Sequence, residues 1–420
     1  MRMRFHWLLA ISVIVALSFS LLSWSGTIKM QLIERNFQVA EKRYDQLLLT
    51  ATDKSKYPHS LNKDGSLFYY GIDEWTGGFW PGCLWFMFEF TGDAKWKKAA
   101  EEWTASLESN QFNTVHHDIG FMMFSSYGNG LRLTGNESYK PILVQSARSL
   151  CKRYSPVVGS IQSWPARRSK DGRNHWQFPV IMDNMMNLEL LFWAAKETGD
   201  SSFYHIAVKH AETTRKNHVR PDHSSFHVVN YDPVSGKMLH QQTLQGFSDN
   251  SAWSRGQAWG IYGFTATYRF TKDRRFLQTA IGMADFYLDN KRLPADRIPL
   301  WDFNAGQKGY KPDWAYDPNK YNPVPRDVSA ASITASALLE LSEYCDGKRR
   351  KKYYDAAANM LESLSRPEYL NDTGSNPYFL LKHSVGNLPS DREVDVPLIY
   401  ADYYFLEAMH RYIKMNLGRE

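Results

Sequence analysis

A short turn that recurs along the chain constrains the fold more than any other sequence feature. Each copy joins an apolar helical segment to a Thr-Gly-Asp-like turn, and an aromatic residue then opens the next helix. Glycine or asparagine suits the left-handed end of a helix, and the small residues that follow allow close helix packing. The sequence therefore predicts five helical hairpins. Their turns begin near Thr91, Thr134, Thr198, Thr271 and Cys345.

Two further helices complete this pattern. A helix over residues 33–49 and the C-terminal stretch LIYADYYFLEAMHRYI form a sixth pair, whereas strand signals are weak and brief, as at residues 226–231. We therefore predict an all-α protein, an (α/α)6 barrel that forms one domain over residues 30–420. An open helical solenoid is the alternative, but the intervals between the turns are too uneven for a stacked array.

The N-terminus has the pattern of an export signal. In MRMRFHWLLAISVIVALSFSLLSWSG, Arg2 and Arg4 precede an apolar run from Trp7 to Trp24. This order is typical of a secretory signal peptide. The run is nearly long enough to span a bilayer, so an uncleaved membrane anchor over residues 1–25 is the alternative. In both cases we expect the rest of the chain to be exported, either to the bacterial periplasm or facing outward from the membrane.

Composition excludes several classes of partner. The net charge is +6 over 420 residues with the basic residues scattered, which does not indicate a nucleic-acid-binding surface. The sequence lacks zinc-ligand spacing and a phosphate-binding glycine loop, so we expect no metal and no cofactor. Three cysteines without motif spacing imply no disulfide framework. The 14 Trp and 24 Tyr could serve a core, but such rings also stack on sugars.

The long connections between the predicted helices are candidate functional segments. Loops longer than about a dozen residues in a compact domain are usually functional or disordered. Each of these loops contains tryptophan, which disordered segments rarely do. They cover residues 73–85, 160–179, 240–260 and 298–318.

Adjacent histidines precede an aspartate in HHDIGFMMF, where His116, His117 and Asp118 are followed by an apolar run. Such residues can bind a metal. However, adjacent side chains on a helix point in different directions, and no partner lies four residues further on. We therefore favour a role in binding or catalysis without a metal.

A second polar group lies in FPVIMDNMMNLELL, where Asp183, Asn184 and Asn187 are surrounded by apolar residues. Helix capping explains such residues at a helix start and remains one interpretation. A third group lies in WSRGQAWG, where Arg255 and Trp259 are four residues apart and so share a helix face. Trp253 is also expected beside Arg255. A guanidinium beside an indole suits a carboxylated sugar, since the fork binds the carboxylate and the ring stacks.

Long ordered motifs resemble one known family. They are WTGGFWPGCLW, HHDIGF, FPVIMDNMMNLELL, FHVVNYDPVSG, WSRGQAWGIYGF and IYADYYFLEA. In these motifs the chain resembles the unsaturated glucuronyl hydrolases, glycoside hydrolase family 88, over nearly everything that follows the N-terminal segment. The resemblance implies a catalytic (α/α)6 barrel. It also implies a substrate class, namely lyase-generated, glycosaminoglycan-type oligosaccharides with a 4,5-unsaturated uronic acid at the non-reducing end.

The resemblance also assigns roles to individual residues. It implies that Asp183 is the general acid/base and that Asp118 is a second essential aspartate that holds substrate hydroxyls. The implied substrate-binding residues are His117, His227, Gln245, Arg255, Trp259, Trp75 and Trp164. The last two are expected to be stacking walls.

Hydrolysis of an unsaturated uronate requires one carboxyl group that acts as acid and then as base. It does not require a nucleophile from the enzyme. Protonation of carbon 4 leaves an oxocarbenium-like centre at carbon 5, which water attacks, and the resulting hemiketal opens. A carboxyl serves as the acid if its pKa is raised by apolar surroundings or by a second carboxylate. Asp183 lies among methionines, and Asp118 would be the second carboxylate. A helix N-terminus would oppose this shift.

Three other functions remain open from the sequence. An unsaturated rhamnogalacturonyl hydrolase would share this fold and chemistry. A sugar epimerase or isomerase would use His116, His117 and His227 as acid and base, since a fold alone does not decide function. A non-catalytic sugar-binding protein would not need two carboxylates beside apolar surfaces, because such groups are costly to bury.

Overall fold

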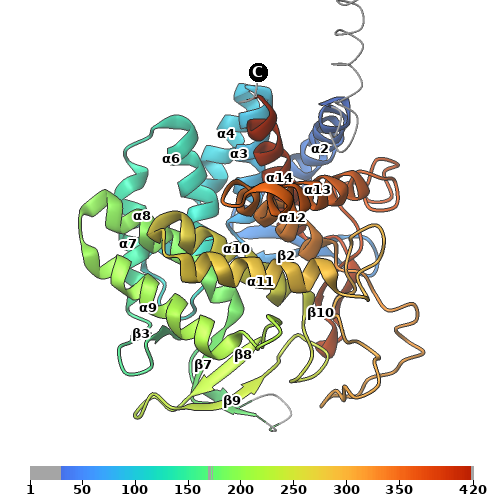
Figure 1. The fold of residues 1–420 in the computed structure, drawn as a ribbon. Coiled ribbons are helices and arrows are strands. Elements are labelled where there is room, and N and C mark those ends of the chain that lie inside the picture. The colour runs from blue at the N-terminus through green and yellow to red at the C-terminus, as the bar shows by residue number, and fades with distance from the viewer. Residues whose placement is uncertain (1–29, 169–171, 173, 418–420) are drawn as a thin grey trace, which may run out of the picture.

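A computed structural model describes residues 30–168, 172 and 174–417 (Figure 1). The predicted signal peptide or anchor, residues 1–25, lies outside the described residues. Helices dominate the fold, which confirms the mostly helical class. The α-helices are α2 (Met30–Thr50), α3 (Phe79–Thr91), α4 (Ala94–Ala105), α5 (Ile119–Met123), α6 (Asn129–Thr134), α7 (Tyr139–Cys151), α8 (Leu188–Thr198), α9 (Ser201–His218), α10 (Ser254–Thr271), α11 (Arg274–Asp289), α12 (Val328–Glu343), α13 (Gly347–Leu364) and α14 (Ile399–Leu417).

The predicted turns are present, and their residues explain why they recur. The hydroxyl of Thr91 donates to the carbonyl of Met87 in the last turn of α3. Gly92 then adopts a left-handed conformation with φ of 69°, and the Asp93 carboxylate accepts the N–H of Lys95 at the start of α4. The turns after α8 and α10 repeat this arrangement, with Lys272 in place of glycine after α10. Each of these three turns thus ends one helix and caps the next, whereas no side-chain cap is present at the starts of α7 and α13.

Alternate helices pack against one another. Contacts run from α3 to α6, from α5 to α8, and then from α8 to α10, α10 to α12 and α12 to α14, while α14 also contacts α3. We call α3, α5, α6, α8, α10, α12 and α14 the inner helices. The helix that follows each short turn packs outside, as α4 does on α3 and α11 on α10. A π-helical turn, η2 (Phe124–Gly128), joins α5 to α6.

Close approach between inner segments depends on glycine at two positions. A Cβ atom on Gly120 would lie 2.4 Å from the backbone of Asn187, and one on Gly263 would lie 2.4 Å from Met185. Both glycines bring an inner helix against the short 3₁₀ helix η3 (Met182–Asn187), which carries Asp183. The main hydrophobic cluster extends from Ile33 near the start of the described chain to Tyr412 near its end.

The structure also contains small antiparallel sheets. Apart from a strand near residues 226–231, the sequence does not predict them. They lie in the long connections between outer and inner helices. The strands are β1 (Lys56–Leu61), β2 (Leu67–Gly71), β3 (Tyr154–Ser155), β4 (Ser160–Ile161), β5 (Arg167–Arg168), β6 (His175–Trp176), β7 (Phe178–Ile181), β8 (Val228–Tyr231), β9 (Met238–Gln242), β10 (Ser384–Asn387) and β11 (Arg392–Val396). Two 3₁₀ helices, η1 (Glu108–Phe112) and η4 (Leu388–Ser390), complete the elements.

The three-stranded sheet β7-β8-β9 positions part of the candidate site. Its register pairs Ile181 with Val228, and the N–H of Met182 donates to the carbonyl of His227 at 3.1 Å. The sheet therefore places the residue that precedes β8 opposite the residues that follow β7, so that His227 comes close to Asp183. In the part of the chain that the structure describes, no helix has the length and apolar character needed to cross a membrane.

Candidate active site

The predicted site residues lie where the long connections lead into the inner helices. Asp118 directly precedes α5, Asp183 lies in η3 before α8, and Arg255 lies in the first turn of α10. Arg255 also contacts Asp327, which caps α12, and its guanidinium lies 5.4 Å from the ring of Tyr400 at the start of α14. The fold thus gathers side chains from separate helix starts into one region.

Asp183 is a buried carboxyl group, with 9% of the residue exposed. Burial raises the pKa of Asp183 to about 7, and the negative charge of Asp118 acts in the same direction. Arg255 and Trp259 favour the charged form and oppose the shift. A carboxyl with this pKa can give up a proton and take one back near neutral pH.

Helix capping does not account for Asp183. No side-chain capping bond is present at the start of η3, and the buried Oδ2 of Asp183 has no hydrogen-bond partner among the described residues. The neighbouring amides have structural roles instead. Asn187 Oδ1 accepts the N–H of Phe121 at 2.9 Å, and Asn184 Nδ2 donates to the carbonyl of Ile161 at 2.7 Å.

His227 presents one defined nitrogen to Asp183. Its Nδ1 accepts the backbone N–H groups of Leu244 and Gln245, each at 3.2 Å. Burial holds the pKa of His227 well below its usual range, so the ring is neutral and its proton lies on Nε2. Nε2 is 3.6 Å from Asp183 Oδ2. His227 is therefore a donor directed at the carboxyl group.

Asp118 differs from Asp183 in its charge state. Burial would raise the pKa of Asp118, but His117 and His116 outweigh burial and hold it below the usual range. His117 Nε2 is 3.2 Å from Oδ1 and His116 Nδ1 is 3.3 Å from Oδ2. The site therefore has one carboxylate that stays ionised beside one that is easily protonated. Carboxyl pairs whose pKa values are pushed apart in this way can divide acid and base roles.

The Arg255 side chain makes more contacts with protein groups than the sequence predicts. It is 1% exposed, and Nη1 pairs with Asp327 Oδ2 at 3.0 Å and also donates to the carbonyl of Val385. Nη2 donates to the carbonyl of Gly386 at 2.6 Å, and Gln245 Nε2 donates to the same carbonyl at 3.0 Å. The guanidinium stacks on Trp253 at 4.4 Å. Binding of a substrate carboxylate by Arg255 stays a prediction, since both terminal nitrogens already contact protein acceptors.

The three predicted aromatic residues lie in two groups. Trp259 is fully buried, and its ring lies 5.2 Å from Phe121. Trp75 is half-buried and also contacts Phe121, at 5.7 Å, and Tyr400, at 4.9 Å. Trp164, also half-buried, belongs to a separate cluster on the β7-β8 side of the site, and Arg167 lies 5.0 Å from its ring.

Several residues of this region were not predicted to belong to it. Asp327 is fully buried against Arg255, and Glu393 bonds His59 at 3.0 Å and Tyr70 at 2.8 Å. Asp327 precedes Val-Ser-Ala, which resembles an ordinary helix cap, so no local signal could have identified it. Within the described ranges, no group of three or more His, Cys, Asp and Glu side chains is arranged to hold a metal ion.

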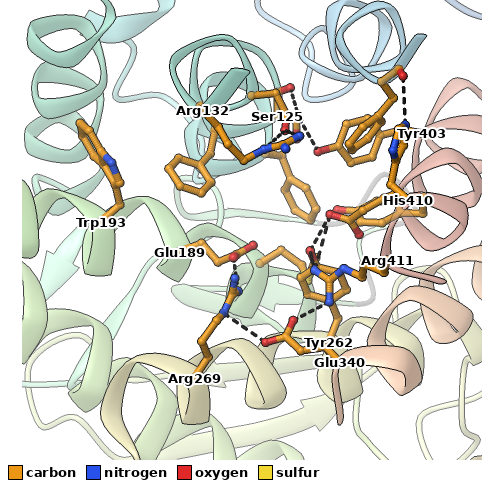
Figure 2. A pocket seen from close by; sticks show the side chains of 18 of the residues that line it. Ser125, Arg132, Glu189, Trp193, Tyr262, Arg269, Glu340, Tyr403, His410 and Arg411 are labelled. Atoms are coloured by element: carbon orange, nitrogen blue, oxygen red, sulfur yellow. Dashed lines mark hydrogen bonds and ion pairs between the residues drawn. The ribbon is translucent and has the colours of Figure 1, made fainter. Parts of the chain in front are cut away.

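A cavity of about 650 Å³ lies near the C-terminal ends of the inner helices, and none of the predicted site residues lines it. Figure 2 shows this cavity from close by. Phe121, Met186 and Tyr404 line it, and the rings of Phe121 and Tyr404 contact Trp259. Most of its charged side chains pair with one another. Arg269 bonds Glu189 and Glu340, Arg411 bonds Glu340 and Glu407, and Arg132 and Lys414 bond Glu89. The sequence did not predict this network.

Known proteins resemble the chain over most of its length. The sequence profile of Glycosyl Hydrolase Family 88 matches residues 56–279. An unsaturated glucuronyl hydrolase of Formosa agariphila is 42% identical over 390 residues, which cover 92% of each chain. The crystal structure of an unsaturated glucuronyl hydrolase specific for heparin has 42% sequence identity and a TM-score of 0.82, and the match covers 91% of this chain and 98% of that one.

A third relative bears on the aspartates. It is an unsaturated glucuronyl hydrolase of Streptococcus agalactiae, solved as an aspartate-to-asparagine variant in complex with dGlcA-GalNAc6S. It has 30% identity, a TM-score of 0.75 and coverage of 93% of both chains. The resemblance seen in the sequence motifs is thereby confirmed, and the chain belongs to glycosyl hydrolase family 88.

Proposed function

We propose that this glycoside hydrolase is an unsaturated glucuronyl hydrolase. It would release the 4,5-unsaturated uronic acid from the non-reducing end of lyase-generated, glycosaminoglycan-type oligosaccharides. The single observation that carries the proposal is the buried Asp183 carboxyl, whose pKa is raised to about 7 beside the ionised Asp118. The relatives support it, since the one from Streptococcus agalactiae was crystallised with a dGlcA disaccharide after an aspartate had been replaced.

In the proposed reaction Asp183 acts first as an acid and then as a base. Its carboxyl proton passes to carbon 4, and the electrons of the carbon 4–carbon 5 double bond form the new C–H bond. Positive charge then develops at carbon 5 and the ring oxygen. A water molecule attacks carbon 5 and returns a proton to Asp183. The resulting hemiketal opens and releases the sugar from carbon 1 together with a keto acid, so that one water molecule is consumed.

The remaining site residues would support these steps. Asp118 would accept hydrogen bonds from substrate hydroxyls, and His227 would donate through Nε2 toward Asp183 or the substrate. His117, Gln245, Arg255 and Trp259 would line the subsite of the unsaturated sugar, and Trp75 and Trp164 would stack against sugar rings.

The proposed scaffold is an (α/α)6 barrel that forms one catalytic domain over residues 30–420. The contacts among the inner helices, including the contact between α14 and α3, support a closed ring. The solved relatives support it as well, with TM-scores of 0.82 and 0.75. The continuous hydrophobic cluster from Ile33 to Tyr412 supports one domain.

An epimerase that relies on histidines fits this geometry poorly. His227 has its Nδ1 occupied by two N–H donors and a proton on Nε2, so no lone pair is directed at the site. Burial also lowers the pKa of His117, and its Nε2 is 3.2 Å from Asp118. A rhamnogalacturonyl hydrolase would use the same carboxyls, so substrate comparison must separate the two hydrolases.

A panel of lyase-made disaccharides tests the function. Disaccharides from chondroitin, hyaluronan and heparin should lose the ultraviolet absorbance of the conjugated double bond when enzyme is added without metal or nucleotide. The unsaturated rhamnogalacturonan disaccharide should react more slowly than the best of these. Faster turnover of rhamnogalacturonan would assign the chain to the rival hydrolase. Activity that a chelator abolishes would reopen a metal role for His116, His117 and Asp118.

We further propose that the enzyme acts outside the cytoplasm. The basic residues and apolar run over residues 1–25 support export, either with cleavage or as an anchor. N-terminal sequencing of the protein recovered from fractionated cells distinguishes these two forms. Recovery of the intact chain in the cytoplasmic fraction would contradict both.

A further inference from the structure

A strained hairpin lies beside the candidate active site. It comprises β10, η4 and β11, residues 384–396. The described part of the chain has seven non-glycine residues with positive φ, and four of them lie in or next to this hairpin. They are His383, Asp391, Glu393 and Asp395, with φ of 62°, 52°, 55° and 58°. Such conformations persist only where surrounding contacts enforce them, and they are common at ligand clamps.

Two predicted substrate-binding residues hold the hairpin in place by hydrogen bonds to its backbone. Arg255 donates to the carbonyls of Val385 and Gly386, and Gln245 donates to the carbonyl of Gly386. The backbone of Gln245 also donates to His227, which faces Asp183. The hairpin is thus bonded to the same residues that surround the proposed acid.

Asp327 fixes the arginine that makes these bonds. Its Oδ2 pairs with Arg255 Nη1 at 3.0 Å, and both side chains are almost completely buried. Its Oδ1 accepts the N–H of Ser329 at 3.1 Å and the Ser329 hydroxyl at 2.6 Å, which anchors the carboxylate to the start of α12. Removal of one partner of a buried ion pair leaves an uncompensated charge, so we expect Arg255 to depend strongly on Asp327.

The far strand of the hairpin is held separately. Glu393 in β11 bonds His59 in β1 and Tyr70 in β2. Its side chain crosses to β10 because Gly386 has no side chain. A Cβ atom there would lie 1.9 Å from Glu393 Oε2.

We propose that Asp327 is a positioning residue for the hydrolysis, which holds Arg255 in place and thereby the β10–β11 hairpin against the substrate site. Its Oδ1 also accepts the N–H of Val385 in β10 directly, at 3.5 Å. This proposal rests on the proposed function only for the expected change in KM. The expected change in hydrogen exchange does not depend on the substrate. Asp327 touches protein groups rather than reacting atoms. The geometry of the hairpin carries the proposal whichever unsaturated uronate is the substrate.

Asp327→Asn tests this role with little change in shape. Asparagine caps a helix about as well as aspartate, so α12 should form as before. With the ion pair lost, we expect KM for the best lyase-made disaccharide to rise about tenfold or more while kcat changes little, because the cost falls on an organised binding surface. Hydrogen exchange of the amides in residues 384–396 should accelerate about tenfold or more in the free enzyme.

The opposite result has a clear meaning. If Arg255 served only the substrate carboxylate, Asp327 would compete for it, and Asp327→Asn would lower KM or leave it unchanged. That outcome, together with unchanged exchange in the hairpin, would overturn the proposal. The exchange experiment needs no substrate, so an enzyme inactive on every unsaturated disaccharide would count against the proposed function alone.

Two further variants complete the design. Asp200→Asn makes the same change at an exposed helix cap, where Asp200 accepts the N–H of Ser202 at 2.9 Å, and should alter neither KM nor exchange in the hairpin. Gly386→Ala disturbs the hairpin from its other side, because the added methyl displaces Glu393. It should reproduce the faster exchange and the raised KM. If Gly386→Ala leaves both unchanged, the hairpin is not part of the substrate site.

Discussion

Asp183→Asn should remove most turnover while the protein still folds and binds substrate. Asparagine keeps the shape of the side chain but has no acidic proton for carbon 4. General acid–base catalysis typically contributes about 100- to 10,000-fold, so kcat should fall by at least this range. Absorbance assays on the best disaccharide give kcat, and equilibrium binding of the same disaccharide to the inactive variant gives affinity. Reaction of the parent enzyme in heavy water should place deuterium on carbon 4 of the keto acid.

Asp402→Asn provides a contrast for this variant. Burial raises the pKa of Asp402 to about 7 as well, but its carboxylate accepts the N–H groups of Leu380 and Leu381 at 2.8 and 2.9 Å. We expect this variant to lower the melting temperature and to leave kcat per folded molecule near that of the parent.

An active Asp183→Asn enzyme that still delivers deuterium to carbon 4 would move the chemistry to Asp118.

Asp183 and Asp402 show which features of a buried carboxyl group can be predicted from the local sequence. Both carboxyls lie near helix starts among apolar residues, and burial raises the pKa of each to about 7. Only the structure shows that backbone donors satisfy Asp402, whereas Asp183 Oδ2 lacks a partner among the described atoms. The sequence motifs identified Asp183 because the long stretch around it resembles a family, and its local pattern fitted capping equally well.

Short-range features of the fold were predictable. The Thr-Gly-Asp turns depend on residues within a few positions of one another, so Thr91, Thr198 and Thr271 mark helix ends as expected. The contacts of Arg255 depend on residues far along the chain, namely Asp327, Val385 and Gly386. The guanidinium stacks on Trp253, which the WSRGQAWG stretch predicts as a neighbour of Arg255. It also lies 5.4 Å from the ring of Tyr400, which that stretch does not predict. Contacts between residues so far apart in the chain produce no local sequence pattern, so residue spacing cannot predict them.

The pH dependence of the reaction should report the protonation of Asp183. The acid must be protonated to react, and its pKa is about 7, so kcat/KM should fall about tenfold per pH unit above that value. Burial is the main cause of the raised pKa, and the charge of Asp118 adds to it. Asp118→Asn removes that charge. The pKa of Asp183 should then fall, and the alkaline limb of the profile should move to lower pH.

The same variant separates two roles of Asp118. If its carboxylate also holds substrate hydroxyls, the plateau of kcat/KM below the limb should drop, because hydrogen bonds to a charged group are stronger than those to an amide. The position of the limb reports the electrostatic effect, and the height of the plateau reports the contacts with substrate. A limb that stays in place, or moves to higher pH, would show that the charge of Asp118 does not raise the pKa of the catalytic group, and burial alone would then account for the raised pKa of Asp183.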